Sequence, residues 1–352
     1  MNDSKLDQRL QQIPANIWEK ITQIDELKGR WEGSARLGPQ TKGRLKRSIL
    51  VTSTGASTRI EGARLSDEDV DKLMRGISIQ LFADRDLQEV QGYYELLENV
   101  FESWDRLKLS EGLIKHFHQE LLKYVEKDEL HRGEYKHQEN KVYMIDEAGE
   151  SVGVLFDTTP AYLTPKEMQE LVEWCRTAID KKTHHPLLVI AGFLVQFLHI
   201  HPFEDGNGRL SRILTNLMLL QAGYSYVPYV SHEKIIEDNK ADYYLALRQS
   251  QRTFETKEET IVPWLEFFLV VVHQQAIKAL ELLSDAGFEK LLSPRQVAVW
   301  KYIQEEEEAT PKEMADALNI PRPTINQVVN KLLDLDKIER LGAGRGTRYR
   351  LK

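Results

Sequence analysis

A continuous apolar segment in the second half of the chain most restricts how this protein can fold. The segment from Pro186 to Ile200, PLLVIAGFLVQFLHI, contains no Asp, Glu, Lys or Arg. It is shorter than the ~20 residues that a membrane-spanning helix needs. We therefore expect it to form a helix in the core of a globular domain, although a densely charged stretch follows it directly.

The bulk composition sets the class of protein and excludes some functions. At 352 residues the chain is long enough for two or three domains. Its net charge of −8 argues against a general binder of nucleic acid or of membranes. The single cysteine, Cys175, cannot form an intrachain disulfide and is interpreted as a packed thiol in a reducing compartment. Because no apolar stretch opens the chain, we expect a cytoplasmic protein without a membrane partner.

Most of the chain has helical periodicity, with capping residues at the expected helix starts. Ser66, Thr164, Ser293 and Thr310 are each predicted to be helix N-caps. Only the segment from Lys141 to Phe156 has the pattern of strands, with two β-prone runs on either side of an Asp-Glu-Ala-Gly turn. This pattern predicts a β-hairpin, either an ordinary surface hairpin or a functional one.

Three parts are expected along the chain. A helical region covers residues 1–100, a helical core with the hairpin at 141–156 covers residues 101–285, and a small module covers residues 290–352. The fold class is therefore predicted to be mainly α.

The turn Gly206-Asn207-Gly208 lies in the charged stretch, HIHPFEDGNGRLSR, and precedes a segment with helical periodicity. Glycines at this place leave the first N–H groups of the helix free, at the positive end of the helix dipole. Such a helix start is a binding site for anions. Arg209 and Arg212 are three residues apart, so both can point toward the same anion, and a polyphosphate fits this arrangement.

Two further side chains complete a chemistry for phosphates. Asp205 can hold a Mg²⁺ ion that bridges phosphate oxygens, and His201 is placed to act as a general base for a hydroxyl. Together these groups predict phosphoryl or nucleotidyl transfer. The alternatives are a metal cluster at the two histidines and a structural turn with surface arginines. His199 is interpreted as a packed histidine rather than a catalyst.

The segment from His201 to Arg212 resembles the signature of the Fic family, His-Pro-Phe-x-Asp-Gly-Asn-Gly-Arg-x-x-Arg, without a gap. The resemblance implies transfer of AMP from ATP to a hydroxyl of a protein side chain, with release of pyrophosphate. In that reaction His201 takes the proton of the hydroxyl and Asp205 binds Mg²⁺. The resemblance also implies that Arg212 binds the γ-phosphate and that Phe203 anchors the loop in the core. In that reaction the α- and β-phosphates are bound by Gly206, Asn207, Gly208 and Arg209.

A second motif lies far upstream. The hexapeptide STRIEG, Ser57 to Gly62, resembles the inhibitory motif of the same family, on a helix expected at about 55–62. Ser57 and Glu61 are four residues apart and share a helical face. The resemblance implies that Glu61 pairs with Arg212 and displaces the γ-phosphate, since both anions compete for one guanidinium. The alternative is a capping box between Thr58 and Glu61, which the following glycine disfavours.

Two other segments resemble parts of the family. The hairpin at 141–156 corresponds in position to a flap that holds the target segment by strand addition. The segment DNKADYYLALRQSQ resembles the one that lines the adenine pocket, with Tyr244 and Gln251 as the expected contacts. Alternatively, Tyr243 or Tyr244 is simply an aromatic residue of the core.

The C-terminal module resembles a winged helix, a frequent addition in the family. Its pattern is helix, helix, turn, helix and hairpin, with the second helix of the helix-turn-helix at 321–335 and GAGRG at the wing tip. Residues on that helix are candidates for contact with DNA: Arg322, Thr324, Asn326 and Gln327. The basic wing can contact phosphates, but the same fold also serves protein association.

The sequence thus predicts a Fic-type helical bundle with a hairpin flap, an N-terminal helical region and a C-terminal winged helix. The expected function is an autoinhibited protein adenylyltransferase that uses ATP and Mg²⁺, modifies another protein or itself, and forms a homodimer. One alternative is removal of AMP with Glu61 positioning a water. Others are transfer of UMP or phosphocholine, and a DNA-binding regulator whose core only senses nucleotide.

Overall fold

The computed structural model describes residues 5–34, 39–76, 84–145, 151–283, 292–334, 337–342 and 346–351. The chain forms two compact units, one made of Met1–Lys28 and Ser48–Ala276, the other of Gly29–Arg47 and Ile277–Lys352. The fold is mainly helical, which confirms the predicted class. In the described part of the chain, no helix is both long and apolar enough to span a bilayer.

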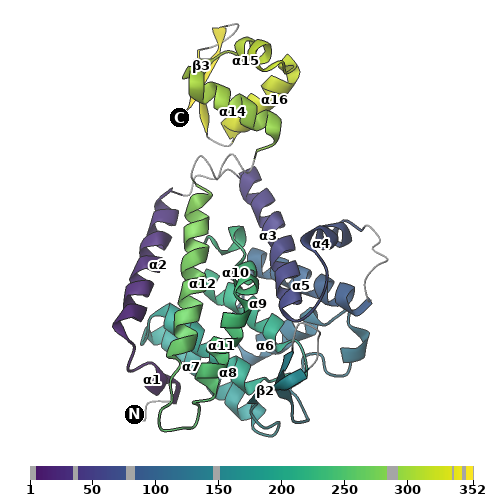
Figure 1. The fold of residues 1–352 in the computed structure, drawn as a ribbon, viewed down its shortest axis with the longest axis vertical. Coiled ribbons are helices and arrows are strands. Elements are labelled where there is room, and N and C mark those ends of the chain that lie inside the picture. Colours follow the sequence, from purple (N-terminus) through teal and green to yellow (C-terminus); the bar gives the residue numbers. More distant parts are fainter. Residues whose placement is uncertain are drawn as a thin grey trace. The chain divides into compact units, whose positions relative to one another are not determined.

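The first unit is built almost entirely from helices (Figure 1). In chain order its elements are α1 (Lys5–Arg9), α2 (Ala15–Ser34), α3 (Pro39–Ile60), α4 (Asp67–Met74), α5 (Asp84–Ser103), α6 (Glu111–Leu121), η1 (Glu126–Asp128), β1 (Lys141–Ile145), β2 (Ser151–Asp157), α7 (Thr164–Lys181), α8 (Pro186–Ile200), α9 (Asn207–Gln221), η2 (Val227–Tyr229), α10 (His232–Asp238), α11 (Lys240–Gln251) and α12 (Val262–Glu281). The ends of α2, α3 and α12 belong to the second unit.

Helix α8 is the apolar segment predicted for the core, and it is buried along almost its whole length. The helices that precede and follow it in the chain, α7 and α9, both pack against it. Helix α8 ends at Ile200, and the C-cap residue His201 has a left-handed backbone with φ 51° and ψ 60°. Gly206, with φ 77°, is the N-cap of α9. The charged stretch therefore forms a short loop that the two most deeply buried helices hold from both ends.

Three of the four predicted caps are confirmed. Ser66, Ser293 and Thr310 each form a capping box with the residue three positions later. The prediction for Thr164 is wrong by one residue, because Leu163 is the N-cap of α7 and has no side-chain bond. The Thr164 hydroxyl instead donates to the Pro160 carbonyl 3.2 Å away, so it cannot cap the free N–H groups.

The predicted hairpin is present as β1 and β2, which pair antiparallel with Lys141 opposite Asp157. The second strand extends one residue beyond the predicted end at Phe156. The predicted turn at 146–149 lies outside the described residues. Asn140 and Thr158 flank the two strands, and the Thr158 hydroxyl donates to the Asn140 carbonyl at 2.8 Å, which closes the base of the hairpin.

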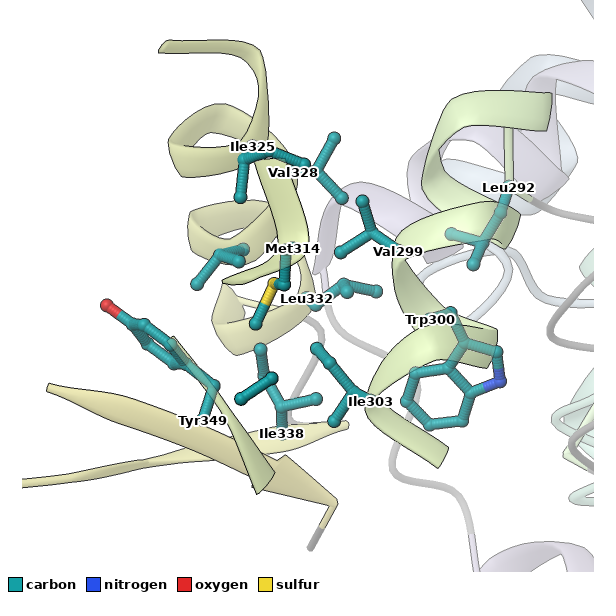
Figure 2. Close-up of a cluster of buried hydrophobic side chains, with 12 residues drawn as sticks. Leu292, Val299, Trp300, Ile303, Met314, Ile325, Val328, Leu332, Ile338 and Tyr349 are labelled. Atoms are coloured by element: carbon teal, nitrogen blue, oxygen red, sulfur yellow. The ribbon is translucent and has the colours of Figure 1, made fainter. Parts of the chain in front are cut away.

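The second unit contains the predicted winged helix. Its elements are α14 (Pro294–Glu306), β3 (Glu308–Ala309), α15 (Pro311–Leu318), α16 (Arg322–Asp334), β4 (Ile338–Leu341) and β5 (Arg348–Leu351), with strand order β3-β5-β4. Figure 2 shows its core, to which α14 contributes Trp300 and Ile303, α16 contributes Leu332 and β5 contributes Tyr349. Residues 343–345, at the predicted wing tip, lie outside the described residues.

Candidate active site

The loop between α8 and α9 is anchored in the core by a stack of two aromatic rings. Phe203 is fully buried, and its ring lies parallel to the His118 ring with 3.9 Å between centroids. The Asn207 side chain accepts from the Phe203 N–H (3.0 Å) and donates to the Phe203 carbonyl (2.8 Å). Phe203 and Asn207 therefore hold the shape of the loop with their side chains.

His118, on α6, is a residue of the site that the sequence analysis missed. Its Nδ1 accepts from the Gly133 N–H at 2.9 Å, so the ring proton is on Nε2, which lies 3.0 Å from the Asp205 carbonyl and donates to it. Burial lowers the pKa of His118 to about 4, which keeps the ring neutral. The only signal in the sequence was its place on the apolar face of a helical segment beside Phe117 and Leu121.

His201 is oriented as a general base requires. Its Nδ1 lies 3.3 Å from the Leu198 carbonyl, an acceptor, so the proton is on Nδ1 and the lone pair is on Nε2. Burial lowers the pKa of His201 to about 4; the Lys136 charge acts in the same direction, while Glu61 and Asp205 act against it. The imidazole is therefore neutral at pH 7.

The N-terminus of α9 already has an anion beside it. The first N–H groups of any helix lack partners within the helix, and here they belong to the glycine turn. The Glu61 carboxylate lies at this place, so close that a Cβ on Gly208 would be 2.2 Å from Glu61 Oε1. Only glycine at position 208 permits this approach.

Arg212 joins the loop to the upstream motif. Its guanidinium lies 2.7 Å from Glu61 Oε1, and it donates to the Ser57 hydroxyl (2.8 Å) and the Ser57 carbonyl (2.9 Å). The Arg212 side chain is 2% exposed, and within the described part of the chain its second terminal nitrogen has no hydrogen-bond partner. The Thr58 hydroxyl donates to the Thr54 carbonyl inside α3, so a capping box at Thr58 is excluded.

Asp205 and Arg209 belong to a chain of alternating charges. Asp205 Oδ2 accepts from Arg209 (3.0 Å) and from Arg85 (2.7 Å), and both arginines also pair with Glu89 at 2.7–2.8 Å. Burial acts against the charge of Asp205, but Arg209 and the Gly206 N–H lower its pKa below the ordinary value. Arg85 and Glu89 lie on α5, and nothing in their local sequence indicated this contact.

The carboxylate of Asp205 suits one kind of metal site. In the described ranges, no group of three or more His, Cys, Asp or Glu side chains can hold an ion unaided. His199 instead packs edge-on against Phe254, with 4.8 Å between the ring centroids. Asp205 is 39% exposed, and its Oδ1 accepts one hydrogen bond, from Gly206. A single accessible carboxylate fits Mg²⁺ when phosphates and waters supply the other ligands.

The two expected adenine contacts lie in different surroundings. Tyr244 is half-buried, and its hydroxyl lies 3.5 Å from the Ile60 carbonyl, next to Glu61. Gln251 is 3% exposed and donates to the Val195 carbonyl of α8 (3.2 Å). The structure thus brings Tyr244 to the end of α3, beside Glu61, and places Gln251 in the helical core. Tyr243 is buried and packs on Trp264.

Comparison with known proteins defines the class to which this fold and site belong. Residues 108–219 match the Fic/DOC family, and residues 295–339 match a winged helix-turn-helix DNA-binding family. A Fido domain-containing protein of Dictyostelium discoideum is 40% identical over 103 residues, which are 28% of this chain and 68% of that protein. The chain belongs to the Fic/DOC family and carries a C-terminal winged helix.

Three further proteins are similar to parts or all of this chain. A solved structure of a Fic family protein from Desulfovibrio desulfuricans superposes with a TM-score of 0.63 at 25% identity, covering 97% of both chains. A probable protein adenylyltransferase of Aquifex aeolicus is 37% identical over 84 residues, or 24% of this chain. This chain spans about a quarter (25%) of that adenylyltransferase and 11% of the adenylyltransferase Fic of Drosophila melanogaster, which is 44% identical over 57 residues.

Proposed function

We propose that the protein is a protein adenylyltransferase that Glu61 holds in an inhibited form. The observation that carries the proposal is the Glu61 carboxylate, 2.7 Å from the Arg212 guanidinium and directly against the start of α9. The complete signature at 201–212 and the adenylyltransferase relatives support AMP as the transferred group. A homodimer and a cytoplasmic location stay predictions of the sequence.

In the proposed reaction the chain positions ATP and removes one proton. The His201 Nε2 lone pair takes the proton of the target hydroxyl, whose oxygen forms a bond to the α-phosphorus. The bond between the α- and β-phosphates breaks and pyrophosphate leaves. The N–H groups at the start of α9, with Arg209 and Arg212, bind the phosphate oxygens where negative charge develops. Asp205 would hold a Mg²⁺ ion, which would supply further positive charge to the bound phosphates.

The inhibited form follows from competition for one guanidinium. Arg212 is buried and already has hydrogen bonds to Glu61 and Ser57, so the γ-phosphate finds its partner engaged. The carboxylate also adds a negative charge where the triphosphate would bind, and like charges at short distance repel. Two buried serine contacts hold α3 in this position: Ser57 to Arg212, and Ser53 to Ser231 at 2.8 Å.

The proposal predicts that Glu61→Gly increases the transfer of AMP, because the carboxylate no longer competes with phosphate. The measurement is protein-bound label after incubation with a cell lysate, Mg²⁺ and ATP labelled on its α-phosphate. Adding His201→Ala to Glu61→Gly should lower labelling by roughly 10²–10⁴-fold, as loss of a general base does. Labelling that stays at or below the wild-type level in Glu61→Gly contradicts the inhibitory role.

The same pair of proteins separates addition from removal of AMP. If the enzyme removes AMP and uses Glu61 to position water, the wild-type protein should release AMP from a labelled protein. The Glu61→Gly variant should then lack this activity. An adenylyltransferase shows the opposite order of activities in the labelling assay.

Contact with DNA is a second candidate function, favoured by the match of residues 295–339 to a DNA-binding family. Arg322, Asn326 and Gln327 are exposed on α16. The basic strand β5 is less available, because Arg348 pairs with Glu308 and Glu313, and Arg350 pairs with Glu339. The proposed contact therefore rests on α16 more than on the wing.

A further inference from the structure

A buried lysine, Lys136, lies next to the loop that carries His201. Lys136 is 3% exposed, and its ammonium nitrogen lies 2.8 Å from Asn140 Oδ1, 2.9 Å from the Thr158 hydroxyl and 3.0 Å from the Ile200 carbonyl. These three acceptors use all three protons of the ammonium group. All three acceptors are neutral, so hydrogen bonds stabilise the ammonium charge without a contacting carboxylate. Burial of a charge in this way costs free energy, which suggests that the lysine has a specific role.

The three acceptors come from the two ends of the hairpin and from the end of α8. Asn140 directly precedes β1, Thr158 directly follows β2, and Ile200 is the last residue of α8, immediately before His201. We name this group the lysine clamp: Lys136, Asn140, Thr158 and the Ile200 carbonyl.

The clamp also holds the backbone on the other side of the candidate base. The Lys136 N–H donates to the Pro202 carbonyl at 2.8 Å, so Lys136 binds the carbonyls immediately before and after His201. Asn140 adds a hydrogen bond from its amide nitrogen to the Phe203 carbonyl at 3.0 Å. His201 has a left-handed backbone, which non-glycine residues adopt only where the surroundings impose it.

We propose that Lys136 is a positioning residue that couples the base of the hairpin to His201, so that a target held by the hairpin meets the imidazole in fixed geometry. This inference rests on the proposed transfer activity. Lys136 acts through the hairpin base and the loop and does not contact the nucleotide phosphates. Its loss therefore slows transfer while ATP still binds.

The charge of the clamp also acts on His201. Burial lowers the pKa of Lys136 to about 8, against the opposing charges of Glu139 and Glu167, so the ammonium form predominates at pH 7. A positive charge at this place lowers the pKa of His201, while Glu61 and Asp205 raise it. Removing the Lys136 charge therefore raises the pKa of the base.

The test uses full-length Glu61→Gly as the parent, with Lys136→Met, Lys136→Arg and Lys115→Met added singly. Lys115→Met is the matched control, because Lys115 lies close by, over the Tyr135 ring, but is partly exposed, pairs with Glu134 and is not part of the lysine clamp. The measurements are calorimetric ATP affinity and the initial rate of protein-bound label in a lysate at saturating ATP, across pH. A melting curve for each protein shows that it is folded.

Lys136→Met should lower the saturating rate by about 10–100-fold, since ~1 Å of misplacement costs that much, while ATP affinity stays within about twofold. The acid limb of its pH profile should move to higher pH. Lys136→Arg, which keeps the charge and donors, should recover a large part of the rate, and Lys115→Met should equal the parent. If Lys136→Met does not fold, Thr158→Val tests the same clamp by removing one acceptor.

The outcomes separate the two proposals. A parent that transfers no AMP overturns the proposed function. A parent that transfers AMP while Lys136→Met and Thr158→Val match its rate and pH profile overturns only the clamp. Equal loss of rate and of ATP affinity in Lys136→Met, without recovery in Lys136→Arg, shows a general structural role and also overturns it.

Discussion

Four histidines have strongly lowered pKa values in the folded protein. Burial lowers the pKa of His118, His199, His201 and His232 to about 4 in each case. Each ring is therefore neutral in the folded protein at a pH where an exposed histidine would be charged. His118 has the clearest structural consequence, because its neutral ring both stacks on Phe203 and accepts from Gly133.

The folded protein should lose stability as the pH falls below about 6.5. The unfolded chain binds protons on these histidines near pH 6.5, whereas the folded protein does so only near pH 4, so the unfolded state gains protons first. The stabilisation is complete above pH 6.5 and declines toward pH 4. The His118→Gln variant should show a weaker dependence of the free energy of unfolding on pH. The slope of that free energy against pH should fall by up to ~1.4 kcal/mol per pH unit.

The measurement is urea unfolding at several pH values between 4.5 and 7.5. His116→Gln is the matched control, because His116 is exposed on the same helix. A slope for His118→Gln equal to that of the wild type would contradict the assignment of a neutral, buried His118.

At the scale of elements, one side chain fixes the end of α3 that carries the proposed inhibitory motif. Arg59 donates to both carboxylate oxygens of Glu237 on α10 (2.6 and 3.2 Å) and to Asp67 at the start of α4 (2.9 Å). Gly55 makes this possible, since a Cβ there would lie 2.5 Å from the Arg59 guanidinium. Gly55, inside α3, is thus explained by a close approach and not by a helix break.

Arg59→Ala should therefore raise AMP transfer severalfold, less than Glu61→Gly does. The lost ion pairs contribute about 1 kcal/mol to holding the last turn, while the bond from Glu61 to Arg212 remains. The labelling assay measures this, with Arg64→Ala as the control, because Arg64 is exposed four residues beyond the end of α3. Wild-type labelling in Arg59→Ala, alongside a rise in Glu61→Gly, would show that Arg59 does not hold the motif.

Local patterns in the sequence predicted the elements of this fold and the position of the loop. The apolar run, the capping boxes and the glycine turn are each set by neighbouring residues, so periodicity and spacing indicate them directly. The network around Asp205 depends on Arg85, which is 120 positions away, and the lysine clamp joins segments 64 positions apart. No local pattern encodes such pairs, which is why His118 and Lys136 were missed.

At the scale of the whole molecule, the chain joins a Fic core to a module with its own hydrophobic core. The net charge of −8 and the ion pairs of Arg348 and Arg350 reduce general attraction to DNA. The exposed polar face of α16 is therefore where a contact with DNA is expected.

The full chain should bind duplex DNA with a shallow dependence on salt, because few phosphates are neutralised. Arg322→Ala should weaken binding to a random-sequence duplex by several-fold, as loss of one exposed charge contact at about 1 kcal/mol does. Fluorescence anisotropy at salt concentrations between 50 and 200 mM measures both effects. Arg295→Ala, an exposed arginine at the start of α14, is the control. Absence of binding by the wild type would remove DNA contact from the proposed functions.

The bond between Glu61 and Arg212 lies within one polypeptide, and this has a consequence for how the protein would respond to its surroundings. A tethered carboxylate competes with free nucleotide at an effective concentration that is set by chain geometry and not by the amount of protein. Diluting the protein would leave the balance unchanged, whereas raising the nucleotide level would shift it. In this arrangement the ATP concentration at which the protein becomes active would be set by the chain itself.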